Sequence, residues 1–267
     1  MMRILFCDID DTMTTDGLLT RETANALWDA KDAGLRIVPI TGRPAGWCDH
    51  IARQWPVDGV IGENGGLYFR KTKFGIKRVH SLSPSERAKN RRKLNVIRDE
   101  VLKEVPGCAV ASDQAYREYD LAIDYCEDVK RLSKKNVRKI VEVFQRHGAT
   151  AKVSSIHVNG WYGNFDKLSM AKRYIREVDA SNLEDAPYDY SFIGDSPNDE
   201  PMFSAFHVSF GVANISKFIE SLKYKPDCIM ESEGGAGFAE AVTIIIGCMK
   251  EESKSGIPFG RKNKSAS

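Results

Sequence analysis

The sequence predicts a doubly wound α/β fold, with a mostly parallel, Rossmann-like sheet and an inserted α+β unit that has its own antiparallel sheet. Three observations predict this fold. Short apolar runs alternate with helical patterns over residues 1–62, the same alternation returns after residue 163, and an αββαββ order separates the two. We therefore expect a core of residues 1–80 and 163–250, an insert of residues 81–162 and a polar tail of residues 251–267.

The first part of the core follows a β-α-β-α-β order. The apolar runs ILFC, LRIVPI and DGVIG are typical of buried strands. Residues 20–33 carry small and apolar side chains at helical spacing before Gly34, and residues 44–55 begin with a proline, which favours the first turn of a helix. This alternation predicts parallel strands that are joined by right-handed crossovers.

The insert departs from this alternation, because two helices each precede a pair of strands that we expect to be antiparallel. A hairpin over residues 67–80 is expected to lead into it. The predicted helices of the insert are 83–105 and 133–147, and its strands are 108–111, 117–125, 151–153 and 156–162. After the insert, we expect helices at 167–178, 199–205, 215–222 and 236–250 and strands at 190–194, 207–213 and 227–230.

The charge balance excludes a protein that binds polyanions through its whole surface. The 267 residues hold 39 Lys and Arg against 37 Asp and Glu, so the excess typical of a nucleic-acid-binding protein is missing. The insert, counted over residues 81–160, is more basic, with 16 Lys and Arg against 11 Asp and Glu. A solvated basic face explains this excess as well as a substrate-facing one does, unless the core binds an anion.

The cysteines and the apolar runs indicate the compartment. The 6 cysteines form no CxxC pair and no Cys/His spacing suited to zinc, which predicts free thiols in a reducing environment. Acidic residues interrupt the N-terminal apolar run before it reaches the length of a signal sequence, and no later run is long enough to span a membrane. We therefore expect a cytoplasmic protein that has no membrane partner.

Two carboxylates follow the first predicted strand. Asp8 and Asp10 fall on the same side of the chain by strand alternation, beyond the edge of the sheet where α/β folds bind ligands. A solvated acidic turn would also explain them. However, Asp8 directly follows the buried run ILFC, and a carboxylate at that place requires a proton or a cation. A divalent metal ion is the natural compensation.

The second strand ends in a potential phosphate site. Thr41 supplies a hydroxyl, Gly42 follows it, and the next predicted helix begins with free N–H groups that suit an anion. Arg43 would reach the same anion or point into solvent. A threonine that caps the helix N-terminus explains Thr41 equally well.

A third group of polar residues follows the strand YSFIG. Asp195 and Asp199, with Asn198 between them, offer hard oxygen ligands at the same sheet edge, although a capped helix start would use the same residues. Upstream, Lys167 begins a predicted helix. A cation there opposes the helix dipole, which favours a bound anion beside it.

These segments resemble, in order and in strand context, the four motifs of the haloacid dehalogenase-like (HAD) phosphohydrolase superfamily: DIDDT, ITGRP, the lysine at 167 and GDSPND. IGENGG and GGAGFAEAV are similar to its type IIB cap branch, which includes Cof-type, sucrose-phosphate and mannosyl-3-phosphoglycerate phosphatases. The chain departs from the family pattern at Asp11 and at Leu168, where many relatives have glycine.

The resemblance implies a Mg²⁺-dependent phosphatase that acts on a small phosphorylated metabolite, with a sugar phosphate as the first expectation. Asp8 would form an aspartyl-phosphate, and Asp10 would act as general acid and base. Asp8, the backbone carbonyl of Asp10 and Asp195 would hold the ion. Asp199 would complete the metal site by orienting a metal-bound water or Lys167. The residues that the resemblance implies for phosphate or substrate binding are Thr41, Gly42, Arg43, Asn64, Lys167 and Asn198.

Two other functions use the same kind of aspartate. A phosphomutase would return the phosphoryl group to its substrate. A receiver-like signalling domain would need its phosphoacceptor after the third strand, where DGVIGENGG offers none. Within the insert, His157, Asn159 and Trp161 are candidates for substrate contact, and packing of the insert's sheet is the alternative explanation for them.

Overall fold

The computed structural model describes residues 2–154 and 156–255. Its central sheet has five parallel strands in the order β14-β13-β12-β1-β4, which confirms the predicted parallel core. β1 lies between β12 and β4, and its residues are buried. The strands are β1 (Ile4–Cys7), β4 (Arg36–Pro39), β12 (Tyr190–Gly194), β13 (Ser209–Gly211) and β14 (Cys228–Ile229).

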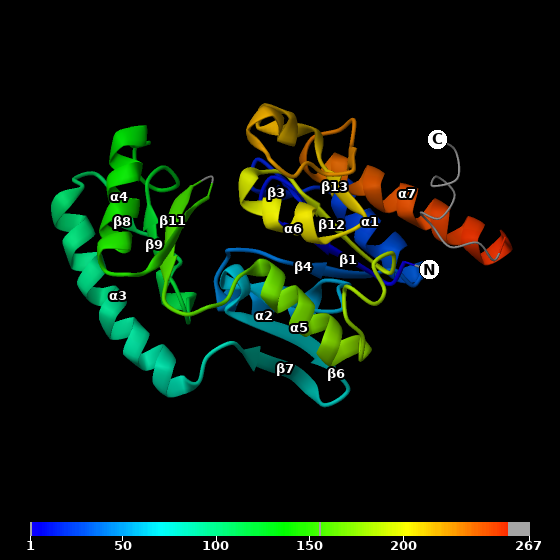
Figure 1. Cartoon of the computed structure of the whole chain (residues 1–267), viewed down its shortest axis with the longest axis horizontal. Helices are drawn as coiled ribbons and strands as arrows, with labels where there is room; N and C mark the ends of the chain where they lie inside the picture. Colours follow the sequence, from blue (N-terminus) through cyan, green and yellow to red (C-terminus); the bar gives the residue numbers. More distant parts are fainter. Residues whose placement is uncertain (1, 155, 256–267) are drawn as a thin grey trace.

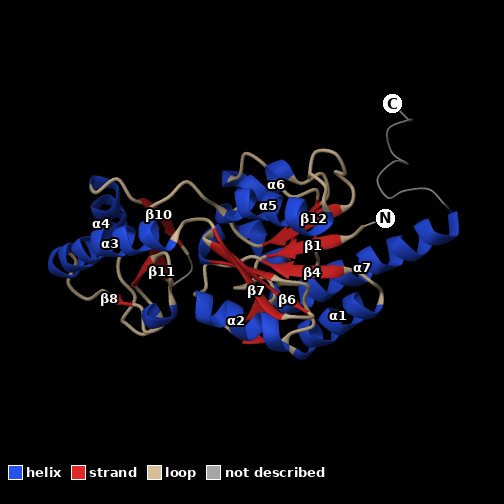
Figure 2. Ribbon diagram, turned by 90° about the horizontal axis from the view of Figure 1, so that it is seen from below, coloured by secondary structure: helices blue, strands red, loops and turns tan. Residues whose placement is uncertain are grey.

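Helices cover both faces of this sheet (Figure 2). Leu5 and Cys7 pack in one apolar cluster with α1, α2 and α7, and Ile4 and Phe6 pack in another with α5 and α6. Side chains that alternate along β1 therefore supply both layers of the core. The helices are α1 (Arg21–Asp32), α2 (Ala45–Gln54), α5 (Lys167–Asp179), α6 (Glu200–Ala205) and α7 (Gly234–Ser255).

The third predicted strand lies beside the core sheet and meets it in parallel, but its main pairing is antiparallel. β5 pairs antiparallel with β6, and only one bridge, Ile40 to Ile61, joins it to the core sheet in parallel. The chain reverses directly after β5, because Glu63 and Asn64 adopt left-handed conformations, with φ of 46° and 54°. The predicted hairpin over 67–80 is confirmed. The three strands are β5 (Val60–Gly62), β6 (Leu67–Thr72) and β7 (Gly75–His80).

The insert has the predicted αββαββ order, and its four strands form an antiparallel sheet in the order β10-β11-β9-β8. Leu94, Ile140 and Phe144 of its helices pack with Val158 in an apolar cluster of their own. Figure 1 shows α3 and α4 on the side of this sheet that faces away from the core. The elements are α3 (Pro84–Glu104), β8 (Ala109–Val110), β9 (Leu121–Asp124), α4 (Lys134–Arg146), β10 (Thr150–Val153) and β11 (His157–Trp161).

Some elements differ from their prediction. The expected helix over 215–222 is replaced by two 3₁₀ turns, because β-branched residues and serines in this stretch favour a helix only weakly. Residues 114–116 form another 3₁₀ turn, and the strand expected over 117–125 begins only at Leu121. Residues 197–199 form one more 3₁₀ turn before α6. The turns of the first stretch are Ala213–Lys217 and Ile219–Ser221.

The two ends of the core also hold unpredicted structure. A small hairpin of β2 (Thr14–Thr15) and β3 (Leu18–Leu19) follows β1. At the other end, α7 continues to Ser255, so the first five residues of the predicted tail are helical. Residues 256–267 of that tail lie outside the described residues. Among the helices that the structure describes, none has the length and apolar character to cross a membrane.

Candidate active site

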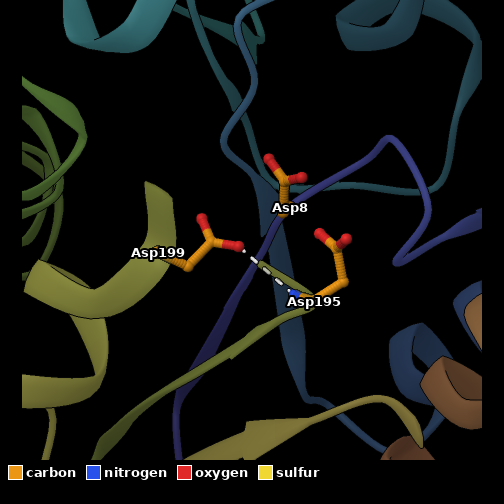
Figure 3. Close-up of side chains that lie close together, drawn as sticks. All are labelled: Asp8, Asp195 and Asp199. Carbon is orange, nitrogen blue, oxygen red and sulfur yellow. Dashed lines mark hydrogen bonds between the residues drawn. The ribbon is translucent and has the colours of Figure 1, made fainter. Parts of the chain in front are cut away.

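Three carboxylates meet where β1 and β12 end. Asp8 follows β1 and Asp195 follows β12, while Asp199 ends the 3₁₀ turn before α6. All three are buried, and one oxygen of each lies within 4.8 Å of the others (Figure 3). The parallel strands bring their C-terminal ends to one edge, so residues 187 positions apart in the chain become neighbours.

Lys167 joins this cluster from the first residue of α5. Its Nζ donates to Oδ1 of Asp8 at 2.7 Å and to Oδ1 of Asp199 at 2.9 Å. Burial alone would lower the pKa of Lys167, but the charges of Asp199 and Asp8 outweigh it and raise the pKa. The ammonium therefore stays charged. Of the predicted residues, these four are the ones that the structure brings together most closely.

One ammonium does not compensate three buried carboxylates. Burial, together with the neighbouring carboxylates, raises the pKa of Asp8 to about 7 and that of Asp195 to about 9. Carboxylate oxygens at this spacing are the donors that Mg²⁺ prefers. The donor set and its excess negative charge therefore fit a divalent cation.

Further hydrogen bonds hold Asp195 in place. The Asp195 backbone N–H donates to Oδ2 of Asp199 at 3.3 Å, Thr12 donates to Oδ1 of Asp195 at 3.2 Å, and Asn214 Nδ2 lies 3.5 Å from Oδ2. Asn214 also donates to the Asp11 carbonyl at 3.0 Å and so ties the turns after β1 and β13 together. Sequence reasoning missed Asn214, although its position just after a core strand was a usable signal.

The Asp10 carboxylate lies outside the cluster that Asp8, Asp195 and Asp199 form. Its carboxylate forms an ion pair with Arg43, whose Nε and Nη2 donate at 3.0 and 2.8 Å. The same guanidinium lies 3.4 Å from Glu127 of the insert and stacks on Trp47. Because Asp10 follows Asp8 by two residues, both leave the strand on one side, but the arginine draws the second carboxylate away from the other three.

The residues expected to bind phosphate lie around the same edge. Gly42 and Asn64 are in contact, since a Cβ on Gly42 would come within 3.3 Å of Asn64 Nδ2. That Nδ2 is buried without a hydrogen-bond partner among the described residues. Thr41 is buried, and its hydroxyl accepts the Arg43 N–H at 2.9 Å; α2 is capped by Pro44 instead. Asn64 thus presents an unused donor, which a ligand oxygen would satisfy.

Comparison with known proteins agrees with this geometry. A family profile described as haloacid dehalogenase-like hydrolase matches residues 5–93, which include the turns after β1 and β4. Two phosphatases match nearly the whole chain. The chain is 28% identical over 247 residues to a phosphoglycolate phosphatase of Pyrobaculum islandicum, covering 91% of this chain and 96% of that protein. The other, a phosphoglycolate phosphatase of Methanoculleus marisnigri, is 25% identical over 244 residues, with the same coverage.

The chain is similar to the haloacid dehalogenase-like hydrolases over the residues that the profile matches. Solved structures agree in fold. A protein of Thermoplasma acidophilum superposes with a TM-score of 0.72 at 19% identity, covering 91% of this chain and 98% of that one. The sucrose-phosphatase of Synechocystis superposes with a TM-score of 0.62 at 15% identity, over 91% and 98% of the two chains. The matched profile and the two phosphatase relatives support a phosphatase.

Asp11, at which the sequence departs from the pattern of the family that it resembles, adopts a φ of 60°. This left-handed conformation explains the glycine preference, and aspartate is among the residues that tolerate it. Its N–H donates to Thr14 at 3.1 Å, and its carbonyl accepts from Asn214. Aspartate at this position is therefore compatible with the turn.

The insert closes one side of the phosphatase's cavity, whose volume is about 640 Å³. Asp8 and Lys167 line it from the core, and His157 and Asn159 line it from β11. Trp161 does not line it, because its ring stacks on Phe165 with centroids 5.9 Å apart. Packing is therefore the better explanation for the tryptophan. Other lining residues predicted from the sequence are Asp10, Gly42, Arg43, Asn64, Asp195 and Asn198.

A buried glutamate connects the core of the phosphatase to the insert. Glu63 is fully buried, and its Oε1 accepts the N–H groups of Ala45 at 3.0 Å and Glu118 at 2.8 Å. Its Oε2 accepts those of Tyr119 at 2.7 Å and Asp120 at 3.1 Å. The first partner begins α2 and the other three precede β9. The sequence pattern ENGG drew attention to Asn64 and gave no signal for the role of its neighbour.

Proposed function

We propose that this phosphatase is a Mg²⁺-dependent phosphomonoesterase in which Asp8 forms an aspartyl-phosphate. One observation carries the proposal. Asp8 lies with Asp195, Asp199 and Lys167 at the C-terminal ends of the parallel strands. Asp8 also lines a cavity that is large enough for a small metabolite. A receiver-like domain would not require this cavity. A phosphomutase would, and it stays the second candidate.

Asp8, Asp195 and the Asp10 backbone carbonyl would hold the ion, with Asp199 orienting Asp195 and Lys167 through its two oxygens. Mg²⁺ at this position would neutralise the repulsion between an anionic phosphate and the attacking carboxylate. The excess of buried negative charge is what supports this assignment.

The chain's own residues supply the bond-making steps. An Asp8 carboxylate oxygen forms a bond to phosphorus while the bond from phosphorus to the ester oxygen breaks. Asp10 gives its proton to that leaving oxygen, then takes a proton from the water that attacks the aspartyl-phosphate, which releases inorganic phosphate and restores Asp8. Arg43 fixes the Asp10 carboxylate through two hydrogen bonds, at 3.0 and 2.8 Å.

The remaining donors would bind the phosphoryl oxygens that carry the charge. Lys167 already contacts the nucleophile, and the free Nδ2 of Asn64 lies in the lining of the same cavity. Thr41 and Asn198 complete the set that the resemblance implies.

Asp10→Asn should separate the proposed acid–base step from phosphate binding. We expect kcat to fall about 10²–10⁴-fold for an alkyl phosphate, whose leaving oxygen needs a proton. The loss should be smaller in the first half-reaction with p-nitrophenyl phosphate, because p-nitrophenolate leaves without one. A burst of p-nitrophenol in rapid-quench measurements checks this. Equal loss of the first step with both esters would contradict the role of Asp10.

Mg²⁺ should stabilise the protein more at about pH 8 than at about pH 6, because Asp8 and Asp195 must lose protons to bind it. Their pKa values of about 7 and about 9 exceed the value of 3.8 in the unfolded chain. Without metal, the folded state therefore binds more protons than the unfolded state, and its stability falls as the pH rises from about 4 to about 9. At about a hundredfold Kd, Mg²⁺ should add about 2.7 kcal/mol. Thermal unfolding with MgCl₂ or EDTA at both pH values measures this.

Asp195→Asn is the control for this measurement. It should lose most of the Mg²⁺-dependent rise in Tm at both pH values while it stays folded, because Thr12 and Asn214 still contact the side chain. The proposed metal site would be contradicted if this variant kept the full Mg²⁺-dependent rise in Tm, or if that rise were larger at the lower pH in the natural protein.

We propose further that residues 81–162 act as a cap on a core of residues 1–80 and 163–250. The substrate is a small phosphate ester, for which the resemblance favours a sugar phosphate and the names of the two relatives favour phosphoglycolate. Phosphate release should be measured over both ester classes, with Mg²⁺ and with EDTA. Release that matches the loss of ester supports a phosphatase, and an isomerised ester without release would indicate the phosphomutase.

A further inference from the structure

The face of the insert's sheet that borders the cavity carries a lysine. Lys152 of β10 pairs with Asn159 of β11 in the antiparallel register, so their side chains lie on the same face. Both line the cavity that contains Asp8 and Lys167. Val158, which precedes Asn159 in β11, packs instead in the apolar cluster that α3 and α4 form with this sheet. Strand alternation therefore directs Lys152 toward the catalytic edge of the core.

The charges that line the cavity are segregated between the two units. Among the described residues, the charged side chains that the insert contributes to the cavity lining are all basic, and none is a carboxylate. The core side carries most of the negative charge. The acidic lining residues are Asp8, Asp10, Asp11, Asp16, Asp195 and Glu233, and the basic ones of the insert are Arg117, Arg131 and Lys152, beside His157.

Two of these basic groups already have partners. Arg117 is buried against Asp113 at 3.0 Å and Asp120 at 3.1 Å, and the Nε2 of His157 lies 2.9 Å from Glu127. The charge of Arg117 is therefore compensated within the insert, and burial lowers the pKa of His157, which favours its neutral ring.

Lys152 and Arg131 differ from them. Neither side chain makes a hydrogen bond or an ion pair with a residue in the part of the chain that the structure describes. Lys152 is half-buried, and burial, followed by the charge of Lys167, lowers its pKa. The charges of Asp166 and Asp199 oppose this effect only in part, and neither carboxylate forms an ion pair with Lys152. A partly dehydrated ammonium without an ion-pair partner is stabilised when an anion binds.

We propose that Lys152, assisted by Arg131, forms a second anion site that binds an anionic group on the alcohol part of the substrate. The proposal rests on the proposed function, because the other end of the ligand is the phosphoryl group at Asp8. The anionic group is a carboxylate or a second phosphate. A simple sugar monophosphate has neither, so the site favours a small phosphorylated acid or a bisphosphate.

Two esters that differ only in this charge test the proposal. Phosphoglycolate carries a carboxylate where 2-hydroxyethyl phosphate carries a hydroxymethyl group. Lys152→Met should lower kcat/KM for phosphoglycolate about 10- to 100-fold, the usual weight of a charge-assisted contact, and change that for the neutral ester less than about twofold. Lys152→Arg should restore most of the loss. Ethylene glycol bisphosphate, measured in parallel, shows whether a second phosphate is preferred to the carboxylate.

The matched control removes one positive charge from the insert elsewhere. Lys135 is exposed on α4 and does not line the cavity, so Lys135→Met should leave kcat/KM for all three esters unchanged. Activity on the neutral ester shows that Lys152→Met is folded. Equal losses on charged and neutral esters, or no loss on either charged ester, would overturn the second anion site. If the natural protein released phosphate from none of the esters, the proposed function itself would fail.

Discussion

Asp8→Asn should abolish turnover of every phosphate ester, by about four orders of magnitude or more, because an amide cannot form the aspartyl-phosphate. The fold should persist. Lys167 keeps its bond to Asp199 at 2.9 Å, and the variant removes one of three crowded carboxylates. Burial raises the pKa of Asp8, so its ionised form destabilises the metal-free fold, and the variant's Tm in EDTA at about pH 8 should equal or exceed that of the natural protein.

Asp185→Asn is a suitable control for this prediction. Asp185 is an exposed carboxylate after α5 whose side chain accepts from Asn182 at 2.7 Å, and it lies outside the cavity lining. Its loss should leave kcat and Tm unchanged. Steady-state phosphate release measures kcat, and acid-quench trapping detects the aspartyl-phosphate. Thermal unfolding in EDTA measures Tm. Substantial turnover by Asp8→Asn would assign the nucleophile to another residue, whereas a lower Tm in EDTA would show that Asp8 is structural.

The predictable part of the site consists of residues at strand ends. Asp8 and Asp195 each follow a strand whose apolar run identifies it, and parallel strands place their C-terminal ends together by topology alone. Lys167 was predictable in the same way, as the first residue of the helix before β12. A local pattern suffices here because the fold supplies the rest of the geometry.

Contacts across the chain were not predictable in this way. The ion pair of Asp10 with Arg43 depends on where a flexible guanidinium finds a carboxylate and on Glu127 from the insert. β5 was expected in the core sheet because an apolar run does not reveal the direction of its pairing. The left-handed turn at Glu63 sets the antiparallel direction of the pairing. That turn is held by contacts with residues more than fifty positions further along the chain.

Glu63→Gln should destabilise the protein strongly. The two carboxylate oxygens each accept two backbone N–H groups, and glutamine offers one oxygen and turns its own NH₂ toward the other pair of donors. Leaving buried donors unpaired costs about 3 kcal/mol in total, and Tm should fall by about 6–12 °C for a chain of this size. Thermal unfolding measures it, with the exposed Glu184→Gln, which should change Tm by less than about 2 °C, as the control.

The position of Glu63 between the two units makes a second readout decisive. Amide hydrogen exchange should speed up at Glu118, Tyr119 and Asp120 and at the start of α2, because these N–H groups lose their acceptor. Exchange in the apolar cluster of α3 and α4 should stay slow, since that cluster does not contact Glu63. Faster exchange throughout the chain would mean general loss of stability. A Tm and an exchange pattern like those of the natural protein would show that water replaces the carboxylate and that the insert is held to the core by other contacts.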